Sequence, residues 1–386
     1  MNRAITSVVI VLLAVAALPC CGQGFRASIG ADGAPLIVVR GDSFHMGLLL
    51  GRLMRGEIQQ LVQTMVGSLD QRGKRYAPEN LDAAWEAVSP HISDRWKQQL
   101  QGLAEGSGVD RRDLIRVHMI PVVGDYSCSG AVIWGDATAD GKMYVFRNLD
   151  FSLDMHLQDL PAVVVYIPTD GVPHVNPTFA GFIGVQTGMN EKGLALTEMG
   201  DSPGRDYPFD LDGAPFHTML SDMLYTAEGL DAAVEMIKQA KRIKKYHYVF
   251  GCGTDGRGVK MKAHAPDLEI WSDNDPDDEV APNVWKHIVI NPESRAPIAF
   301  KHIRENYGKY TAEKVLELTK AVPIKGGNLF AVVYDATDLK MYFAYAKGME
   351  EAYKRRFEPL DLKLCFDFER ARKAFMQPGA VALPAR

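Results

Sequence analysis

The sequence lacks the short motifs by which several large enzyme classes are identified. It has no HExxH helix and no phosphate-binding loop of the GxxxxGK[ST] type. This argues against the zinc peptidases of that motif and against P-loop nucleotide-binding proteins. The net charge is −5 at pH 7 and the basic stretches are short, so no electrostatic footprint for nucleic acid is present. There is also no low-complexity run and no internal repeat, and we expect one large composite domain.

Only one long apolar run occurs, and it lies at the N-terminus. Arg3 precedes an uninterrupted apolar stretch that ends before Pro19. A membrane span needs about 20 such residues, so the shorter run is typical of a secretory signal. We expect a signal peptide over 1–24 and an exported protein, periplasmic or secreted. A lipid anchor at Cys20 or Cys21 is an alternative, although Pro19 fits badly before Cys20.

Cysteine is scarce in the remainder of the chain. Removal of the signal leaves Cys128, Cys252 and Cys365. An odd and small number of cysteines is not a disulfide framework, so at least one thiol stays free in an oxidising compartment. A free thiol in an exported protein requires a reason.

The apolar spacing changes character near Cys128. Before it, the pattern predicts a strand over 34–40 and then mostly helix: 43–66, 80–88, 92–107 and a short helix from Asp110. After it, the pattern predicts strands over 161–168, 178–188, 193–199, 247–253, 259–264 and 284–290, helices over 226–240 and 312–320, and a closing strand pair over 328–335 and 340–346. Blocks of helices and largely antiparallel strands predict an α+β fold.

The segment around Cys128 has the pattern of a β-hairpin. If 136–141 forms its loop, Cys128 lies across from Leu149, and therefore beside Arg147 and Asp150. Residues three apart on a regular strand point to opposite faces, so Arg147 and Asp150 converge only if the strand bends or ends there.

These residue types suit a thiol nucleophile. Arg147 can stabilise a thiolate or a substrate carbonyl, and Asp150 can hold an amine or a bridging water. No histidine is near in sequence, so the missing base could be the α-amino group of Cys128, if the bond after Ser127 were cut. The alternative is that Cys128 is a buried structural cysteine and that Arg147 and Asp150 form an ion pair.

Several segments together resemble the N-terminal nucleophile superfamily, in its penicillin acyltransferase-like branch, with choloylglycine hydrolases and acid ceramidase as relatives. They are CSG at 128–130, GKMYVFRNLD at 141–150, GMNEKGL at 188–194, GDSFHMG at 41–47, GR at 51–52, GLAEGSG at 102–108 and the strand pair at 332–346. The resemblance covers about residues 35–350.

The resemblance implies an αββα sandwich of two antiparallel sheets and a precursor that cleaves itself between Ser127 and Cys128. It divides the chain into a mostly helical pro-region over 25–127, which stays bound as a partner, and a catalytic region over 128–386. Cys128 matches the nucleophile, Arg147 the arginine beside it, and Asp150 the carboxylate that holds the new amine. The expected activity is hydrolysis or acyl transfer at linear C–N amide bonds of a small N-acyl or lipid-like substrate, with no metal or cofactor.

Two points depart from the family pattern or stay open. Where several relatives carry an oxyanion-hole asparagine, this chain has Gly200; its backbone N–H groups or Asn190 could substitute. Alternative functions are a phospholipase B-like lipid or ester hydrolase and an inactive envelope-binding protein of the same fold.

Overall fold

The computed structural model describes residues 22–67, 69, 73–124, 126–200, 210–278, 285–376 and 383–384. The predicted signal peptide, with Cys20 and Cys21, lies outside the described residues except for its last three positions. Two of these, Gln23 and Gly24, belong to the first strand. Within the described part of the chain, no helix has the length and apolar character needed to cross a membrane.

The N-terminal third is mostly helical, as predicted, and it opens with two strands, of which the second was predicted over 34–40 and the first was not. These are β1 (Gln23–Ile29) and β2 (Ala34–Gly41), followed by α1 (Ser43–Leu53), α2 (Arg55–Val66), α3 (Pro78–Val88), α4 (Asp94–Ser107) and α5 (Arg111–Val123). The helix predicted over 43–66 is broken at Met54. The Asp42 side chain accepts from His45 N at 2.9 Å and so begins α1. Gly108 ends α4 in the left-handed conformation, with φ 70°.

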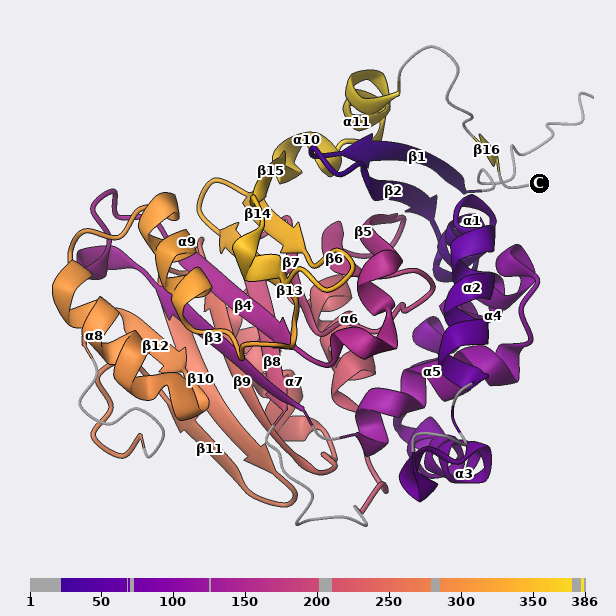
Figure 1. Ribbon diagram of the computed structural model, residues 1–386, viewed down its shortest axis with the longest axis horizontal. Helices are drawn as coiled ribbons and strands as arrows, with labels where there is room; N and C mark the ends of the chain where they lie inside the picture. Colours follow the sequence, from indigo (N-terminus) through magenta and orange to yellow (C-terminus); the bar gives the residue numbers. More distant parts are fainter. Residues whose placement is uncertain are drawn as a thin grey trace, which may run out of the picture.

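The strands form two sheets, one of ten and one of six strands (Figure 1). The larger has the order β11 (Leu268–Trp271), β10 (Arg257–His264), β9 (Lys245–Cys252), β8 (Leu194–Gly200), β7 (Thr187–Asn190), β6 (His174–Phe179), β5 (Pro161–Pro168), β2, β1 and β16 (Leu383–Pro384). The smaller has the order β12 (Ile288–Asn291), β3 (Ser127–Ile133), β4 (Tyr144–Asp150), β13 (Asn328–Asp335), β14 (Lys340–Tyr345) and β15 (Glu358–Asp361). Apart from the parallel contact of β2 with β5, the pairs are antiparallel. The two strands of the region before Cys128 therefore extend the larger sheet.

The two sheets stack face to face, and helices cover their outer faces (Figure 1). Cys128 and Val132 belong to the core between the sheets, whereas Ala131 and Ile133 belong to a second core. That second core is closed by α8 (Ala296–Asn306) and α9 (Ala312–Ala321), while α1, α6 (Phe216–Thr226) and α7 (Leu230–Gln239) lie on the larger sheet. Two short helices, α10 (Leu362–Cys365) and α11 (Phe368–Phe375), follow β15. This is the predicted α+β, αββα arrangement.

Four glycines of the N-terminal motifs explain one tight helix contact. A Cβ atom added at Gly102 of α4 would lie 2.0 Å from Phe44 O of α1, and one at Gly47 would lie 2.0 Å from Gln99 O of α4. Gly51 and Gly106 meet backbone atoms of the opposite helix in the same way. The two helices therefore pack backbone against backbone, which only glycine allows.

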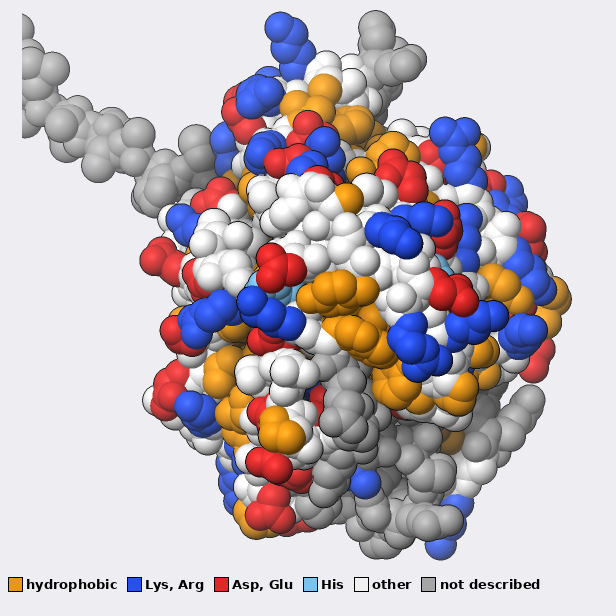
Figure 2. Space-filling view, turned by 90° about the vertical axis from the view of Figure 1, so that its left-hand side faces the viewer, with side chains coloured by type: hydrophobic (Ala, Val, Ile, Leu, Met, Phe, Trp, Pro, Cys, Tyr) orange, Lys and Arg blue, Asp and Glu red, His pale blue; other side chains and the backbone are white. Residues whose placement is uncertain are grey.

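Charged side chains of both signs are interspersed over the face shown in Figure 2. The coloured residues of that face form no large area of one sign. Surface ion pairs elsewhere in the chain include Arg112 with Asp82 at 2.6 Å and Arg257 with Asp231 at 2.7 Å. This face therefore has the mixed charge pattern that the composition predicts.

Candidate active site

Cys128 lies in β3 and has the register that the hairpin pattern predicts. Cys128 pairs with Leu149 and Ser127 with Asp150 across β3 and β4. β4 ends at Asp150, and the ladder with β13 shifts by one residue opposite this end. The side chains of Cys128, Arg147 and Asp150 are all buried. The three sequence-predicted site residues are thus brought together at the end of one hairpin.

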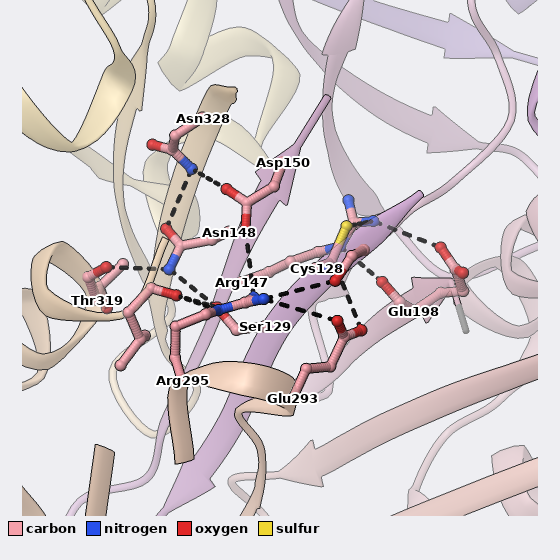
Figure 3. Close-up of polar contacts among 12 residues, drawn as sticks. Cys128, Ser129, Arg147, Asn148, Asp150, Glu198, Glu293, Arg295, Thr319 and Asn328 are labelled. Carbon is pink, nitrogen blue, oxygen red and sulfur yellow. Dashed lines mark hydrogen bonds and ion pairs between the residues drawn. The ribbon is translucent and has the colours of Figure 1, made fainter. Parts of the chain in front are cut away.

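Arg147 contacts the thiol on the face between the sheets (Figure 3). One terminal guanidinium nitrogen, Nη2, lies 3.3 Å from Cys128 Sγ. The Nε atom donates to the backbone oxygen of Glu198 at 2.7 Å, and Nη2 lies 3.4 Å from Glu198 Oε2. The other terminal nitrogen, Nη1, has no hydrogen-bond partner among the described residues. Arg147 is therefore held by β8 with one buried donor left for a further acceptor.

The thiol is protonated in this arrangement. Burial raises the pKa of Cys128 to about 12, and the Arg147 charge opposes that rise. Glu198 and Asp150 act in the same direction as burial, because negative charges disfavour a thiolate. A nucleophile at this position needs a base that removes the proton or a rearrangement that admits water.

A second group of charged residues surrounds the backbone nitrogen of Cys128, away from its thiol. Cys128 N donates to Glu293 Oε1 at 3.4 Å. Arg295 lies 3.6 Å from Glu293 Oε2, 3.4 Å from Asp150 Oδ2 and 3.5 Å from Ser127 Oγ. Arg147 and Asp150 therefore point to opposite faces of the strand, as expected for residues three apart. Arg147 contacts the Cys128 side chain, whereas Asp150 belongs to the group of charged residues around the Cys128 backbone nitrogen.

Asp150 is held in place by neutral and cationic donors. Asn328 Nδ2 donates to Asp150 Oδ1 at 3.0 Å. Burial raises the pKa of Asp150 to about 6, against the opposing effects of Asn328 and Arg295. The ion pair considered from the sequence is not formed: Arg147 pairs with Glu198, and Asp150 pairs with Arg295.

Asn291 is a buried polar residue near Cys128 in the sheet that the sequence pattern did not indicate. It pairs with Gly130 across β12 and β3, so its side chain shares the face of Gly130 and Cys128. It is 1% exposed, and neither atom of its amide has a partner among the described residues. A buried amide without partners is costly in a fold and is available to a ligand. The available signal was the Asn–Pro pair that ends a strand of apolar residues.

Asn190 and Gly200 have different local contacts in the larger sheet. Asn190 Nδ2 donates to Ala227 O at 2.8 Å, and its Oδ1 accepts from the backbone nitrogens of Lys192 and Leu194. Its side chain therefore holds the turn after β7. Gly200 ends β8, and a Cβ atom there would lie 2.6 Å from Tyr126 O. Gly200 thus packs against the segment that leads into Cys128.

An apolar pocket opens beside the hairpin. Its wall includes Leu149, which is opposite Cys128, and Tyr126, which precedes Cys128 by two residues. Leu61 of α2, Val117 of α5 and Phe179 of β6 complete much of its surface. The space in it that a water-sized molecule can occupy is about 70 Å³. The residues before and after Cys128 thus build this pocket jointly.

Known proteins that are similar to this chain include amidases. No family model matches the sequence. The protein dcd1B of Dictyostelium discoideum is 21% identical over 360 residues, which are 84% of this chain and 71% of that protein. The rat N-acylethanolamine-hydrolyzing acid amidase is 20% identical over 230 residues, 58% of each chain. The Caenorhabditis elegans ortholog of that amidase is a solved structure with a TM-score of 0.45 and 14% identity, covering 60% of this chain and all of that one. The chain is therefore similar in sequence to acid amidases, in agreement with the resemblance that its motifs indicated.

Proposed function

We propose that this chain is an amidohydrolase or acyltransferase that uses Cys128 as its nucleophile on the amide bond of a small N-acyl substrate. The observation that carries the proposal is the contact of Arg147 Nη2 with Cys128 Sγ at 3.3 Å, beside an apolar pocket. A buried arginine against a buried thiol favours the thiolate form, which is the reactive one. The names of the acid amidases to which the chain is similar support the same bond type.

The reaction proceeds through a thioester. The sulfur of Cys128 forms a bond to the acyl carbon and passes its proton through the base to the leaving amine, as the C–N bond breaks. Water then forms a bond to the same carbon, the C–S bond breaks, and sulfur regains a proton. An acceptor amine in place of water makes the reaction an acyl transfer. Asn291 Nδ2 and Arg147 Nη1 are the buried donors available to the developing oxyanion.

The base in this proposal is the α-amino group of Cys128, released by cleavage of the Ser127–Cys128 bond. In the uncut chain this nitrogen is an amide and cannot accept a proton. Glu293, which already accepts from it, and Asp150 would then face an amine that titrates near neutral pH. Cleavage also frees the segment that ends at Ser127 to move, and with it Tyr126 of the pocket wall, which gives a substrate access to the buried thiol.

Intact mass and acyl-anilide turnover test the proposal directly. Wild type should be found as two associated fragments, the second beginning at Cys128, and Cys128→Ala as one uncut chain. Cys252→Ala, which removes another buried thiol, is the matched control and should be cut. The cut wild type should hydrolyse chromogenic acyl anilides, and Cys128→Ala should not. Active wild type with an intact Ser127–Cys128 bond would refute the amine as base, while equal turnover in Cys128→Ala would refute the nucleophile.

The oxyanion assignment has its own test. Asn291→Ala should lower kcat by about two to three orders of magnitude with little change in KM, as for loss of one preorganised donor. Asn190→Ala should show no such selective loss of kcat, because the Asn190 amide is used by the turn after β7. An unchanged kcat in Asn291→Ala would assign the oxyanion to other donors.

The pocket predicts a preference for apolar acyl groups. Turnover of acyl anilides from acetyl to palmitoyl should rise with chain length until the pocket is filled. Val117→Phe adds volume from α5 and should shift the preference to shorter chains. A preference that is the same in both proteins would place the acyl group elsewhere.

A further inference from the structure

Glu198 is an ionisable residue in the middle of a buried strand. It lies in β8, where all seven residues are buried, and its side chain is 0% exposed. Isolated burial of a carboxylate is unfavourable, so such a group needs cationic or hydrogen-bonding partners. The partners of Glu198 are Arg147, which contacts the Cys128 thiol, and Tyr126, which precedes Cys128 by two residues.

The contacts of Glu198 connect these two elements. Glu198 Oε2 lies 3.4 Å from Arg147 Nη2, the same nitrogen that contacts Cys128 Sγ at 3.3 Å. Glu198 Oε1 accepts from the hydroxyl of Tyr126 at 2.8 Å. Figure 3 shows the Cys128 sulfur and the Glu198 side chain next to the Arg147 guanidinium. One guanidinium nitrogen is therefore shared between a carboxylate and the thiol.

The charges that face Glu198 come from several elements. Burial raises the pKa of Glu198 to about 7, while Arg147 of β4, the Tyr126 hydroxyl and the nearby Lys244 lower it. Tyr248 of β9 is its cross-strand partner and stays protonated, because its pKa is raised well above its usual range by burial and by Glu198. The Glu198 charge in turn raises the pKa of Cys128. Glu198 thus competes with the thiolate for the charge of Arg147.

We propose that Glu198 is a positioning residue that sets the protonation of the Cys128 thiol through Arg147, and that Tyr126 couples this setting to the segment before the nucleophile. The inference rests on the proposed role of Cys128. While the Tyr126 hydroxyl is in place, it favours the ionised form of Glu198 and keeps the thiol protonated. Displacement of Tyr126 favours neutral Glu198, which leaves the Arg147 charge to the thiolate.

The test is the rate of Cys128 alkylation by iodoacetamide at about pH 7.5, followed on the full chain by site-resolved mass spectrometry. Glu198→Gln keeps the shape and an acceptor for Arg147 but removes the charge. A neighbouring charge shifts a pKa by about one unit or more. One unit raises the thiolate population about tenfold, and the lower nucleophilicity of a less basic thiolate offsets part of this gain. Glu198→Gln should therefore be alkylated about three- to tenfold faster than wild type.

Tyr126→Phe removes one hydroxyl and should accelerate alkylation in the same direction by a smaller factor. In the Glu198→Gln background the tyrosine change should add nothing, since its effect passes through the carboxylate. Tyr345→Phe is the matched control: its buried hydroxyl bonds to Ala162 O and Thr178 O, and its removal should leave the rate unchanged.

A Glu198→Gln rate equal to or below that of wild type would overturn the proposal and make Glu198 a packing partner of Arg147. Additive effects of Tyr126→Phe and Glu198→Gln would overturn the coupling. Failure of the proposed function is distinguishable from this result. In that case wild type would not hydrolyse acyl anilides, but the variants would still show this pattern of alkylation rates.

Discussion

His118 makes the stability of the N-terminal region dependent on pH. It lies in α5 and is 0% exposed. Its Nδ1 atom lies 2.7 Å from Leu114 O, and the backbone nitrogen of Ile183 donates to its Nε2 atom at 3.0 Å. These contacts define a neutral ring with the proton on Nδ1. The rings of Trp96 and Phe182 flank it, with centroids at 5.2 and 4.7 Å. A proton on Nε2 would therefore face another N–H group in an apolar environment.

The magnitude follows from the lowered pKa. Burial lowers the pKa of His118 from 6.5 to about 4. A histidine with a lowered pKa contributes its stability fully above the unfolded value, and this contribution is lost as the pH falls towards the folded value. The shift corresponds to about 3 kcal/mol in total, of which about 2 kcal/mol is lost between pH 7.5 and 5. The neighbouring His217 acts in the same direction, because burial also holds its pKa well below 6.5.

The assay is urea unfolding followed by tryptophan fluorescence, at several pH values between 7.5 and 4. His118→Gln should be less stable than wild type at pH 7.5, because it disturbs two buried hydrogen bonds. On acidification to pH 5 the variant should lose about 2 kcal/mol less than wild type does. His156→Gln is the control, since His156 is exposed, and its pH dependence should match wild type. An equal loss on acidification in His118→Gln and wild type would refute the reasoning.

Three further predictions concern the site and the packing. Arg147→Lys keeps the charge but removes the planar fork, so kcat/KM on an acyl anilide should fall by about one to three orders of magnitude; near-normal turnover would make Arg147 structural. Gly102→Ala places a methyl group against backbone and should lower the free energy of unfolding by about 1–3 kcal/mol or more, whereas Gly56→Ala, which meets open space in α2, should raise it by about 0.5–1 kcal/mol. Lys260 Nζ lies 2.5 Å from Asp278 Oδ2, and the Lys260 side chain is 0% exposed. Asp278→Asn removes this buried counter-charge and should lower the free energy of unfolding by about 3–5 kcal/mol, and the melting temperature with it. An unchanged melting temperature would contradict the burial of this pair.

Local rules were sufficient where one element or one hairpin determines the geometry. The partner of Cys128 follows from the position of the hairpin loop alone, because pairing in an antiparallel ladder is fixed once the loop is fixed. The start of α1 at Asp42 and the end of α4 at Gly108 follow from cap chemistry. The exact bounds of β5 (161–168) and β13 (328–335) were also predicted, since both are short and rich in β-branched or aromatic residues.

Two errors show where local rules fail. The strand predicted over 178–188 is instead the end of β6, a loop and the start of β7. The loop can be apolar and buried because side chains outside it satisfy its backbone: Asn176 Nδ2 donates to Gly184 O, and His118 Nε2, from α5, accepts from Ile183 N. Helix α6 was missed for a related reason. Nine of its eleven residues are buried, so it lacks the polar face that indicates a helix.

The same contrast between local and distant sequence applies to the residues of the site. The sequence places Arg147 and Asp150 beside Cys128 because the hairpin is local, whereas Glu293 is 165 residues from Cys128 and reaches its nitrogen only through the pairing of β12 with β3. A signal for the distant residues was nevertheless present. Glu198 and Asn291 are polar residues within or at the end of strands that are otherwise apolar. A fold of two stacked sheets must bury such residues, and a buried polar group is retained only with partners or for a ligand. Polar interruptions in apolar strands are therefore the positions from which a site in this fold should be sought first.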